Sequence, residues 1–130
     1  MTDREMLEMA ARAASKTIDQ ETFGEYQDAH GGMVVADGEH WNPLIDDGDA
    51  LLLAVRLRMC IDIRSGHTDV TPPGDYRPES VKHGNDPCAA TRRAIVRAAA
   101  EVGRRMIEEN KARKRTTAGL SKNSKCRSRT

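Results

Sequence analysis

Three carboxylates stand together in the run Asp46-Asp47-Gly48-Asp49, directly before an apolar segment of the chain. Such a cluster beside a glycine suggests a Ca²⁺ or Mg²⁺ site, but the alternating ligands and distant bidentate Glu of an EF-hand loop are absent. Carboxylates also accept hydrogen bonds from the free N–H groups of a helix's first turn and interact favourably with its dipole. We therefore predict a helix cap here, with Asp46 or Asp47 at the N-cap, and no metal site.

The histidines and cysteines have no spacing that is typical of a metal site or a catalytic pair. His83, Asp86 and Cys88 could still meet in space, and the first turn of a helix favours the reactive thiolate of a cysteine. We expect instead that Cys88 is a small buried residue on an apolar helix stripe and that the histidines lie in exposed loops. The histidines are His30, His40, His67 and His83, and the cysteines are Cys60, Cys88 and Cys126.

Positive charge gathers towards the end of the chain. Residues 111–130 hold eight Lys or Arg and no acid, so the first 110 residues carry 13 basic against 20 acidic side chains, a net charge of −7. Arginines in the segment before residue 111 continue this positive stretch, which indicates either contact with phosphate or an acidic partner, or a solvated helix face. The residues concerned are Arg92, Arg93, Arg97, Arg104, Arg105, Lys111, Arg113, Lys114 and Arg115.

Three segments carry the signals of helices. Thr2 and Glu5 match a capping box, which predicts a first helix over about residues 3–16. The apolar run after Asp49 predicts a second helix that is central and buried on most of its circumference. Asn85-Asp86-Pro87 opens a third helix, with proline at its first position. We expect a core that includes Leu51, Leu52, Val55, Ile61, Ile95, Ala99 and Val102.

The remaining segments favour short strands. Residues 17–40 contain the β-branched run Met33-Val34-Val35 between glycine turns, which predicts one or two strands. Apolar and polar residues alternate over 59–64, as in a half-buried strand, and the proline-rich segment 65–84 is typical of a loop with a short edge strand at each end. The predicted fold is therefore α+β: three helices packed with a small, mostly antiparallel sheet, in the order α-β-β-α-β-β-α. One domain covers residues 1–110, and a disordered basic tail covers 111–130.

Composition excludes several classes of function. The chain has one Trp, two Tyr and one Phe, too few for a platform on which bases stack. No apolar run reaches the length of a membrane span, no signal peptide is evident, and the odd cysteine count fits a reducing compartment, so we expect a cytoplasmic protein. Trp41 either packs against the helices or contacts a partner.

Two stretches resemble small tailed-phage and prophage proteins of the phage α-β-α sandwich domain group. They run from Trp41 to Leu51 and from Asn85 to Ala100, and the similarity spans about residues 2–107. Both are scaffold motifs, so the resemblance implies a short sheet between helices and a phage accessory role, without any shared activity. The tail after Asn110 lies outside it.

The leading hypothesis is a non-enzymatic phage accessory protein that binds a host or phage protein in the host cytoplasm, including one that counteracts a host defence system. Its acidic body suits a basic partner surface. An alternative is a nucleic-acid or nucleotide-binding protein that uses the third helix and the basic tail. A third is an enzyme centred on Cys88, His83 or the Asp46–Asp49 run. We expect no cofactor, and a homodimer is compatible with the sequence. The residues proposed for protein binding are Trp41, Asp46, Asp47 and Asp49.

Overall fold

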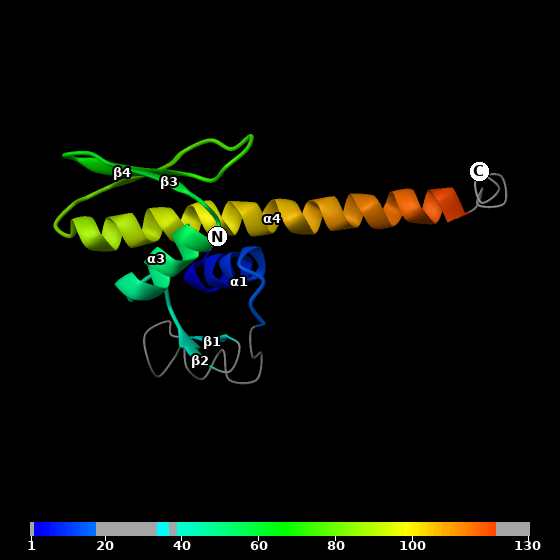
Figure 1. Cartoon of the computed structure of the whole chain (residues 1–130), viewed down its shortest axis with the longest axis horizontal. Coiled ribbons are helices and arrows are strands. Elements are labelled where there is room, and N and C mark those ends of the chain that lie inside the picture. Colours follow the sequence, from blue (N-terminus) through cyan, green and yellow to red (C-terminus); the bar gives the residue numbers. More distant parts are fainter. Residues whose placement is uncertain (1, 18–33, 37–38, 122–130) are drawn as a thin grey trace.

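The computed structural model describes residues 2–17, 34–36 and 39–121, and within these ranges it contains three helices and five strands (Figure 1). This confirms the predicted α+β class. The predicted element order had two strands between the second and third helices, whereas the structure has three, one over 60–63 and two within the segment 65–84. Phe23, Tyr26 and Met33 lie outside the described residues. The elements are α1 (Asp3–Ala13), β1 (Val34–Ala36), β2 (Glu39–Trp41), α3 (Asp47–Arg56), β3 (Cys60–Ile63), β4 (His67–Thr71), β5 (Glu79–Lys82) and α4 (Pro87–Ser121).

The strands form two separate antiparallel sheets instead of one. β1 and β2 make a hairpin, and β3, β4 and β5 make a three-stranded meander with β4 in the middle. The prediction that residues 65–84 contribute only edge strands was wrong for β4. Thr68 and Val70 of β4 are fully buried, and their neighbours are half-buried, which is the alternation of a strand with one face on the core.

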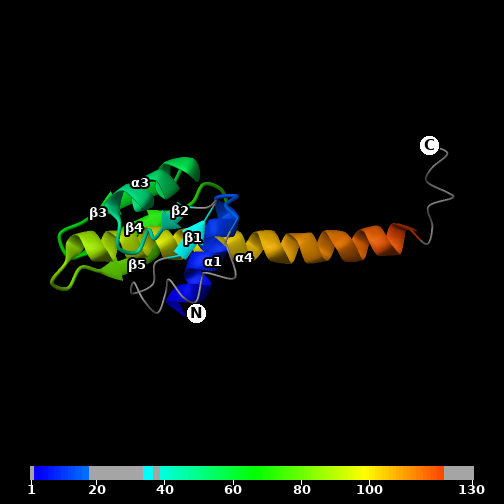
Figure 2. The same ribbon diagram turned by 90° about the horizontal axis from the view of Figure 1, so that it is seen from below.

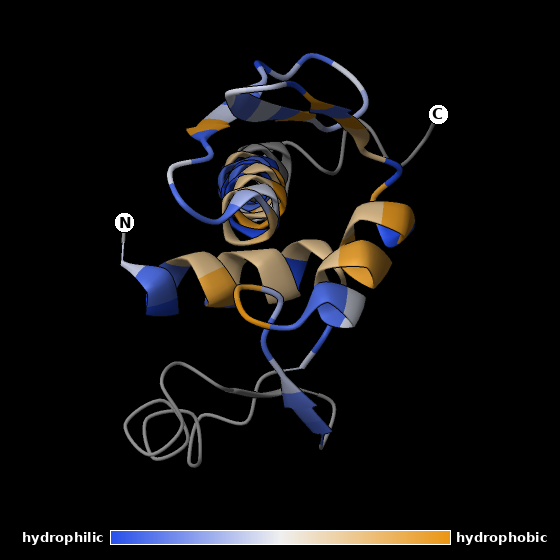
Figure 3. Cartoon of the chain, turned by 90° about the vertical axis from the view of Figure 1, so that its left-hand side faces the viewer, coloured by the Kyte–Doolittle hydropathy of each residue, from blue (hydrophilic) through white to orange (hydrophobic). Residues whose placement is uncertain are grey.

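Helix α4 is the centre of the fold. The three-stranded sheet covers one side of it, and α1 crosses its other side. α3 also packs against α4, between the sheet and α1 (Figures 1 and 3). Its buried side is rich in alanine, and small side chains let neighbouring backbones come close. In the described residues the sheet has helices on one face only, which differs from the sheet between helices that the resemblance implied. The buried residues of α4 include Ala94, Ile95, Val96, Ala98 and Ala99.

Helix α3 is not the central helix that its apolar sequence predicted. Ala50, Leu53 and Ala54 face the core, but Leu51, Leu52 and Val55 are 59, 68 and 65% exposed. The reason is that the other elements pack around α4, so only one side of α3 is covered. Of the other predicted core residues, Ile95 and Ala99 are buried, and Ile61 and Val102 are half-buried.

Helices α1 and α3 end in the same way, although neither end has a glycine. Ser15 and Arg58 adopt positive φ angles of 59° and 54°. The next residue in each case donates its N–H to a carbonyl five positions earlier, Lys16 to Ala11 at 2.8 Å and Met59 to Ala54 at 3.0 Å. This is a Schellman motif. It ends α1 at Ala13, three residues before the predicted end.

Helix α4 continues to Ser121, past residue 110, at which the domain was predicted to end. Glu109 stands four positions before Arg113, an arrangement that stabilises helices. Residues 111–121, predicted as disordered tail, are therefore helical, and their side chains are exposed over 111–115. This end of α4 runs beyond the other elements (Figure 2). Residues 122–130 lie outside the described ranges.

Candidate interaction surface

The clustered carboxylates are engaged with the backbone at the start of α3. Asp46 accepts a hydrogen bond from the N–H of Asp49 at 2.8 Å and is the N-cap. Asp49 Oδ2 in turn accepts the N–H of Asn42 at 2.9 Å. The predicted helix cap is confirmed, and Asp46 fills it. Asp86 plays the same part for α4, since it accepts the N–H of Ala89 at 3.0 Å ahead of Pro87.

Arg92 ties this capped turn to α4. Its Nε donates to the carbonyl of Leu44 at 2.9 Å, and its Nη1 lies 2.6 Å from the carboxylate of Asp47. The guanidinium is mostly buried, whereas the Asp47 side chain is largely exposed. Asp47 therefore helps to place α3 on α4, and it also lies at the edge of the cleft described next.

An apolar cleft of about 410 Å³ opens between α3, β3 and the first turns of α4. Leu51 and Ile63 border it and are 59 and 63% exposed, so apolar surface continues from the cleft onto the outside of the molecule. The Asp47–Arg92 ion pair supplies the polar groups at its edge. We call this site the α3–β3 cleft. Its lining residues are Asp47, Ala50, Leu51, Ile61, Ile63, Pro87, Cys88, Thr91, Arg92 and Ile95.

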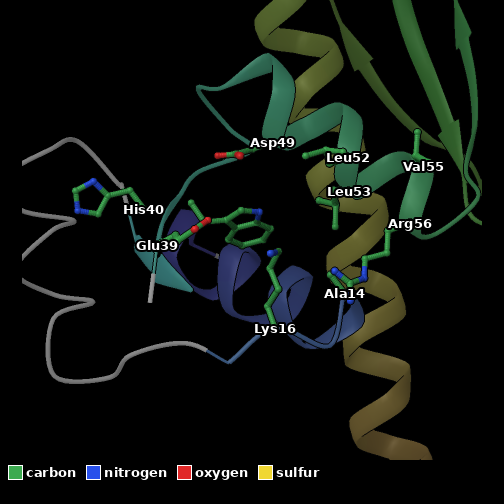
Figure 4. Close-up of a pocket in the computed structure, with 10 residues that line it drawn as sticks. Ala14, Lys16, Glu39, His40, Asp49, Leu52, Leu53, Val55 and Arg56 are labelled. Atoms are coloured by element: carbon green, nitrogen blue, oxygen red, sulfur yellow. The ribbon is translucent and has the colours of Figure 1, made fainter. Parts of the chain in front are cut away.

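A second hollow, of about 320 Å³, lies on the other flank of α3 beside Trp41 (Figure 4). Trp41 is only 5% exposed, and the Nζ of Lys16 lies 5.8 Å from its ring centre. Burial supports the packing interpretation of Trp41 over direct contact with a partner. Asp49, Leu52 and Arg56 border this hollow from α3.

The histidines and cysteines are placed differently from the prediction. His40 and His67 lie in strands β2 and β4 instead of loops, and His30 is outside the described residues. Cys60 and Cys88 are both exposed, so the prediction of a buried Cys88 was wrong; the side of α4 that carries it faces the open cleft. Across the ranges that the structure describes, no three His, Cys, Asp or Glu residues gather as metal ligands would.

The side chain of His83 is hydrogen-bonded to a threonine instead of to the side chain of Asp86 or Cys88. Its Nε2 lies 2.7 Å from Oγ1 of Thr68, which lies 2.8 Å from Oγ1 of Thr91. Thr68 is fully buried, so these bonds satisfy a hydroxyl between the sheet and α4. No local pattern indicates this set of hydrogen bonds, because its three members are far apart in the sequence.

The arginines that suggested a phosphate-binding face are engaged within the molecule. Besides Arg92, Arg93 pairs with Asp3 at 2.8 Å and Arg104 pairs with Glu108 at 2.7 Å. Arg105 stacks 4.0 Å from the ring centre of Tyr76 and donates to the carbonyl of Asp75. Arg97 lies 3.9 Å from Glu79. The positive residues that remain on α4 are Lys111, Arg113, Lys114 and Arg115, all exposed.

Two carboxyl groups are held in their charged form by these and similar contacts. A hydrogen bond from Ser80, helped by the nearby charges of His67 and Arg64, lowers the pKa of Asp69. Hydrogen bonds and charge from Arg104 lower the pKa of Glu101. Both groups are structural, because their partners belong to the sheet surface and to α4 itself.

Comparison with protein families, with curated proteins and with solved structures finds no match for this chain. None of the helices in the described ranges combines the length and apolar character that a bilayer crossing requires. Exposed apolar side chains of α3 and the adjoining cleft form a continuous apolar surface in the described part of the chain. Sequence reasoning placed Leu51, Leu52 and Val55 in the core and so missed it.

Proposed function

We propose that this chain is a non-enzymatic protein-binding protein that takes an apolar segment of a partner protein into the α3–β3 cleft. The observation that carries the proposal is the apolar lining of the cleft together with exposed Leu51 and Ile63 at its border. Exposed apolar surface continuous with a cleft is the usual form of a peptide-binding groove. The resemblance to phage proteins supports a phage accessory role in which the partner is a host or phage protein, including a component of a host defence.

Negative charge around the cleft indicates which kind of partner segment would bind there. Asp46 and Asp86 stand at the N-termini of α3 and α4, and both are exposed. The first 110 residues carry a net charge of −7. A partner segment that combines apolar residues with flanking Lys or Arg would therefore meet complementary charge. Asp47 borders the cleft as well, so one of the carboxylates predicted to bind protein stands where a partner would lie.

The test is capture of a partner from host cells by the tagged protein and by matched variants. Leu51→Glu places a charge at the border of the cleft, and Arg77→Glu changes an exposed residue elsewhere. A partner that is recovered with the unchanged chain and with Arg77→Glu, but lost with Leu51→Glu, supports the proposal. Equal recovery with both variants, or no specific partner at all, contradicts it. Thermal unfolding of each variant shows whether it is folded.

Nucleic-acid binding is a second candidate function, favoured by one observation. Lys111, Arg113, Lys114 and Arg115 are exposed on the part of α4 that runs beyond the body. Phosphate contacts by such residues would give binding that weakens steeply with salt. A labelled DNA duplex should then bind the full chain at low salt and lose that binding when residues 111–130 are removed. DNA binding by the shortened chain, or none by the full chain, contradicts this role for the basic segment.

A further inference from the structure

The outer side of α3 carries a second feature that the cleft does not use. Asp49, Leu52 and Arg56 are spaced by three and four residues, so they follow one another along a single flank of the helix. Figure 4 shows these three side chains along the second hollow. The α3–β3 cleft is lined by other residues of α3, which lie on the opposite flank of the helix: Asp47, Ala50 and Leu51. Leu52 is 68% exposed, and the neighbouring Val55 is 65% exposed. The row therefore consists of an acid, an exposed apolar surface and a base.

Such a row is complementary to itself when the helix direction is reversed. In an antiparallel pair of identical helices, equivalent flanks face each other. If Leu52 lies at the two-fold axis, Asp49 stands three residues to one side and Arg56 four residues to the other. Because the rise is about 1.5 Å per residue, Asp49 of one copy and Arg56 of the other then differ in position along the helix axis by only about 1.5 Å. Two acid–base contacts would bracket the paired leucines.

The charged groups on this flank have capacity for such contacts. Asp49 uses Oδ2 to accept the N–H of Asn42, and its Oδ1 has no hydrogen-bond partner in the described part of the chain. Arg56 is exposed and forms no ion pair with any residue that the structure describes. Antiparallel alignment also brings the positive end of each helix dipole beside the negative end of the other.

We infer that a second copy of this chain covers the outer face of α3, so that the protein forms a two-fold symmetric dimer through antiparallel α3 helices. Leu52 and Val55 form the apolar centre of the interface, and Asp49 of one copy pairs with Arg56 of the other. This inference does not rest on the proposed function, because the α3–β3 cleft lies on the opposite flank of the helix and stays open in the dimer.

Sedimentation equilibrium of charge variants tests the pairing directly. The unchanged chain should have twice the 14.4 kDa mass of one copy. Leu52→Glu should be a monomer. Arg56→Glu and Asp49→Lys should each be monomers alone, because like charges then face each other, but an equimolar mixture of the two should form a heterodimer with both contacts restored. A monomeric unchanged chain, a dimeric Leu52→Glu, or no heterodimer from two folded variants overturns the inference.

Asp49→Lys also removes the acceptor for Asn42 and could unfold α3, so a second measurement is independent of it. In a chain in which Cys60, Cys88 and Cys126 are replaced by serine, Leu52→Cys should form an intermolecular disulfide rapidly under mild oxidation, because the axis brings the two positions together. Ser80→Cys, at an exposed position on the sheet, is the matched control and should not. Equal rates for the two variants overturn the dimer, whatever Asp49→Lys does.

Discussion

Gly103 of α4 lies directly against the backbone of Met9 in α1. A methyl group at Gly103 would come within 2.0 Å of the Met9 carbonyl oxygen and 2.8 Å of its carbonyl carbon. Both atoms belong to the backbone of a helix, so neither can move aside as a flexible side chain would. The close approach of α1 to α4 thus depends on this glycine, and it brings Ala10 and Ala11 of α1 into the core.

Gly103→Ala should therefore destabilise the protein. Alanine favours a helix over glycine by about 1 kcal/mol, but forcing extra volume into a packed contact costs about 1–3 kcal/mol or more, so the clash decides the sign. Urea denaturation measures the change. Gly66→Ala is the control, because nothing lies within 4 Å of the added methyl group. A Gly103→Ala variant as stable as the unchanged chain would show that the two helices can separate at little cost.

Ile95 and Leu52 give a paired test of which apolar residues form the core. Ile95 is 4% exposed, whereas Leu52 is 68% exposed. Ile95→Asp buries an unpaired charge and should lower stability by several kcal/mol, about 3 or more. Leu52→Asp should change the stability of the monomer by about 0.5 kcal/mol or less. Thermal unfolding at low protein concentration compares them, and similar losses for both would mean that α3 is buried on its outer side.

Asp46 provides a test of the cap that opens α3. Removal of the side chain in Asp46→Ala leaves the N–H of Asp49 without its acceptor, which should cost about 1 kcal/mol. Asp46→Asn keeps an acceptor oxygen at the same place, so it should lose much less. Denaturation of the two variants side by side separates the hydrogen bond from the charge. If Asp46→Asn is as unstable as Asp46→Ala, the contribution is that of the negative charge at the helix dipole.

The caps could be predicted from sequence because they are local. Asp46 and Asp86 stand one residue before their helices, and the spacing of their partners is fixed by helix geometry. The exposed side of α3 could not be predicted, since the apolar residues 51–55 look the same whether another element covers them or not. Only the position of α4 at the centre decides that Leu53 is buried and Leu52 is not.

The same distinction explains the other differences. Ser15 and Arg58 end helices in a conformation that usually calls for glycine, so the sequence lacked its normal stop signal. Gly103 gave no signal within the periodic pattern of α4, because its role depends on a backbone almost a hundred residues away. The α3–β3 cleft combines residues of three elements that are far apart in the sequence, so no local pattern predicts it. For the same reason Cys88, which lines the cleft, was predicted to lie on the buried stripe of its helix.

The lowered pKa of Asp69 leads us to expect that the folded protein loses stability in acid. Its pKa is lowered from the ordinary value of 3.8, chiefly by the hydrogen bond from Ser80, so the charged carboxyl favours the folded state. This contribution is complete above the ordinary value and is lost as the pH falls through the lower pKa of the folded protein. Ser80→Ala should therefore reduce the fall in stability below pH 3.8, whereas Ser65→Ala, at an exposed position without such a contact, should not. Identical acid unfolding curves for the two variants would contradict the role of Asp69.

Removal of residues 111–130 should leave the melting temperature nearly unchanged. The side chains of 111–115 are exposed, and α4 has already run past α1 and the sheet at that point (Figure 2). The change takes the net charge from +1 to −7, so ion-exchange elution should shift strongly even though the fold does not. A shorter chain that ends at Gly103 is the matched control. It also loses the Arg104–Glu101 pair and the stacking of Arg105 on Tyr76, so it should melt at a lower temperature. A large loss of stability on removal of 111–130 alone would mean that the basic segment binds the acidic body, and its role as a separate charged arm would then be excluded.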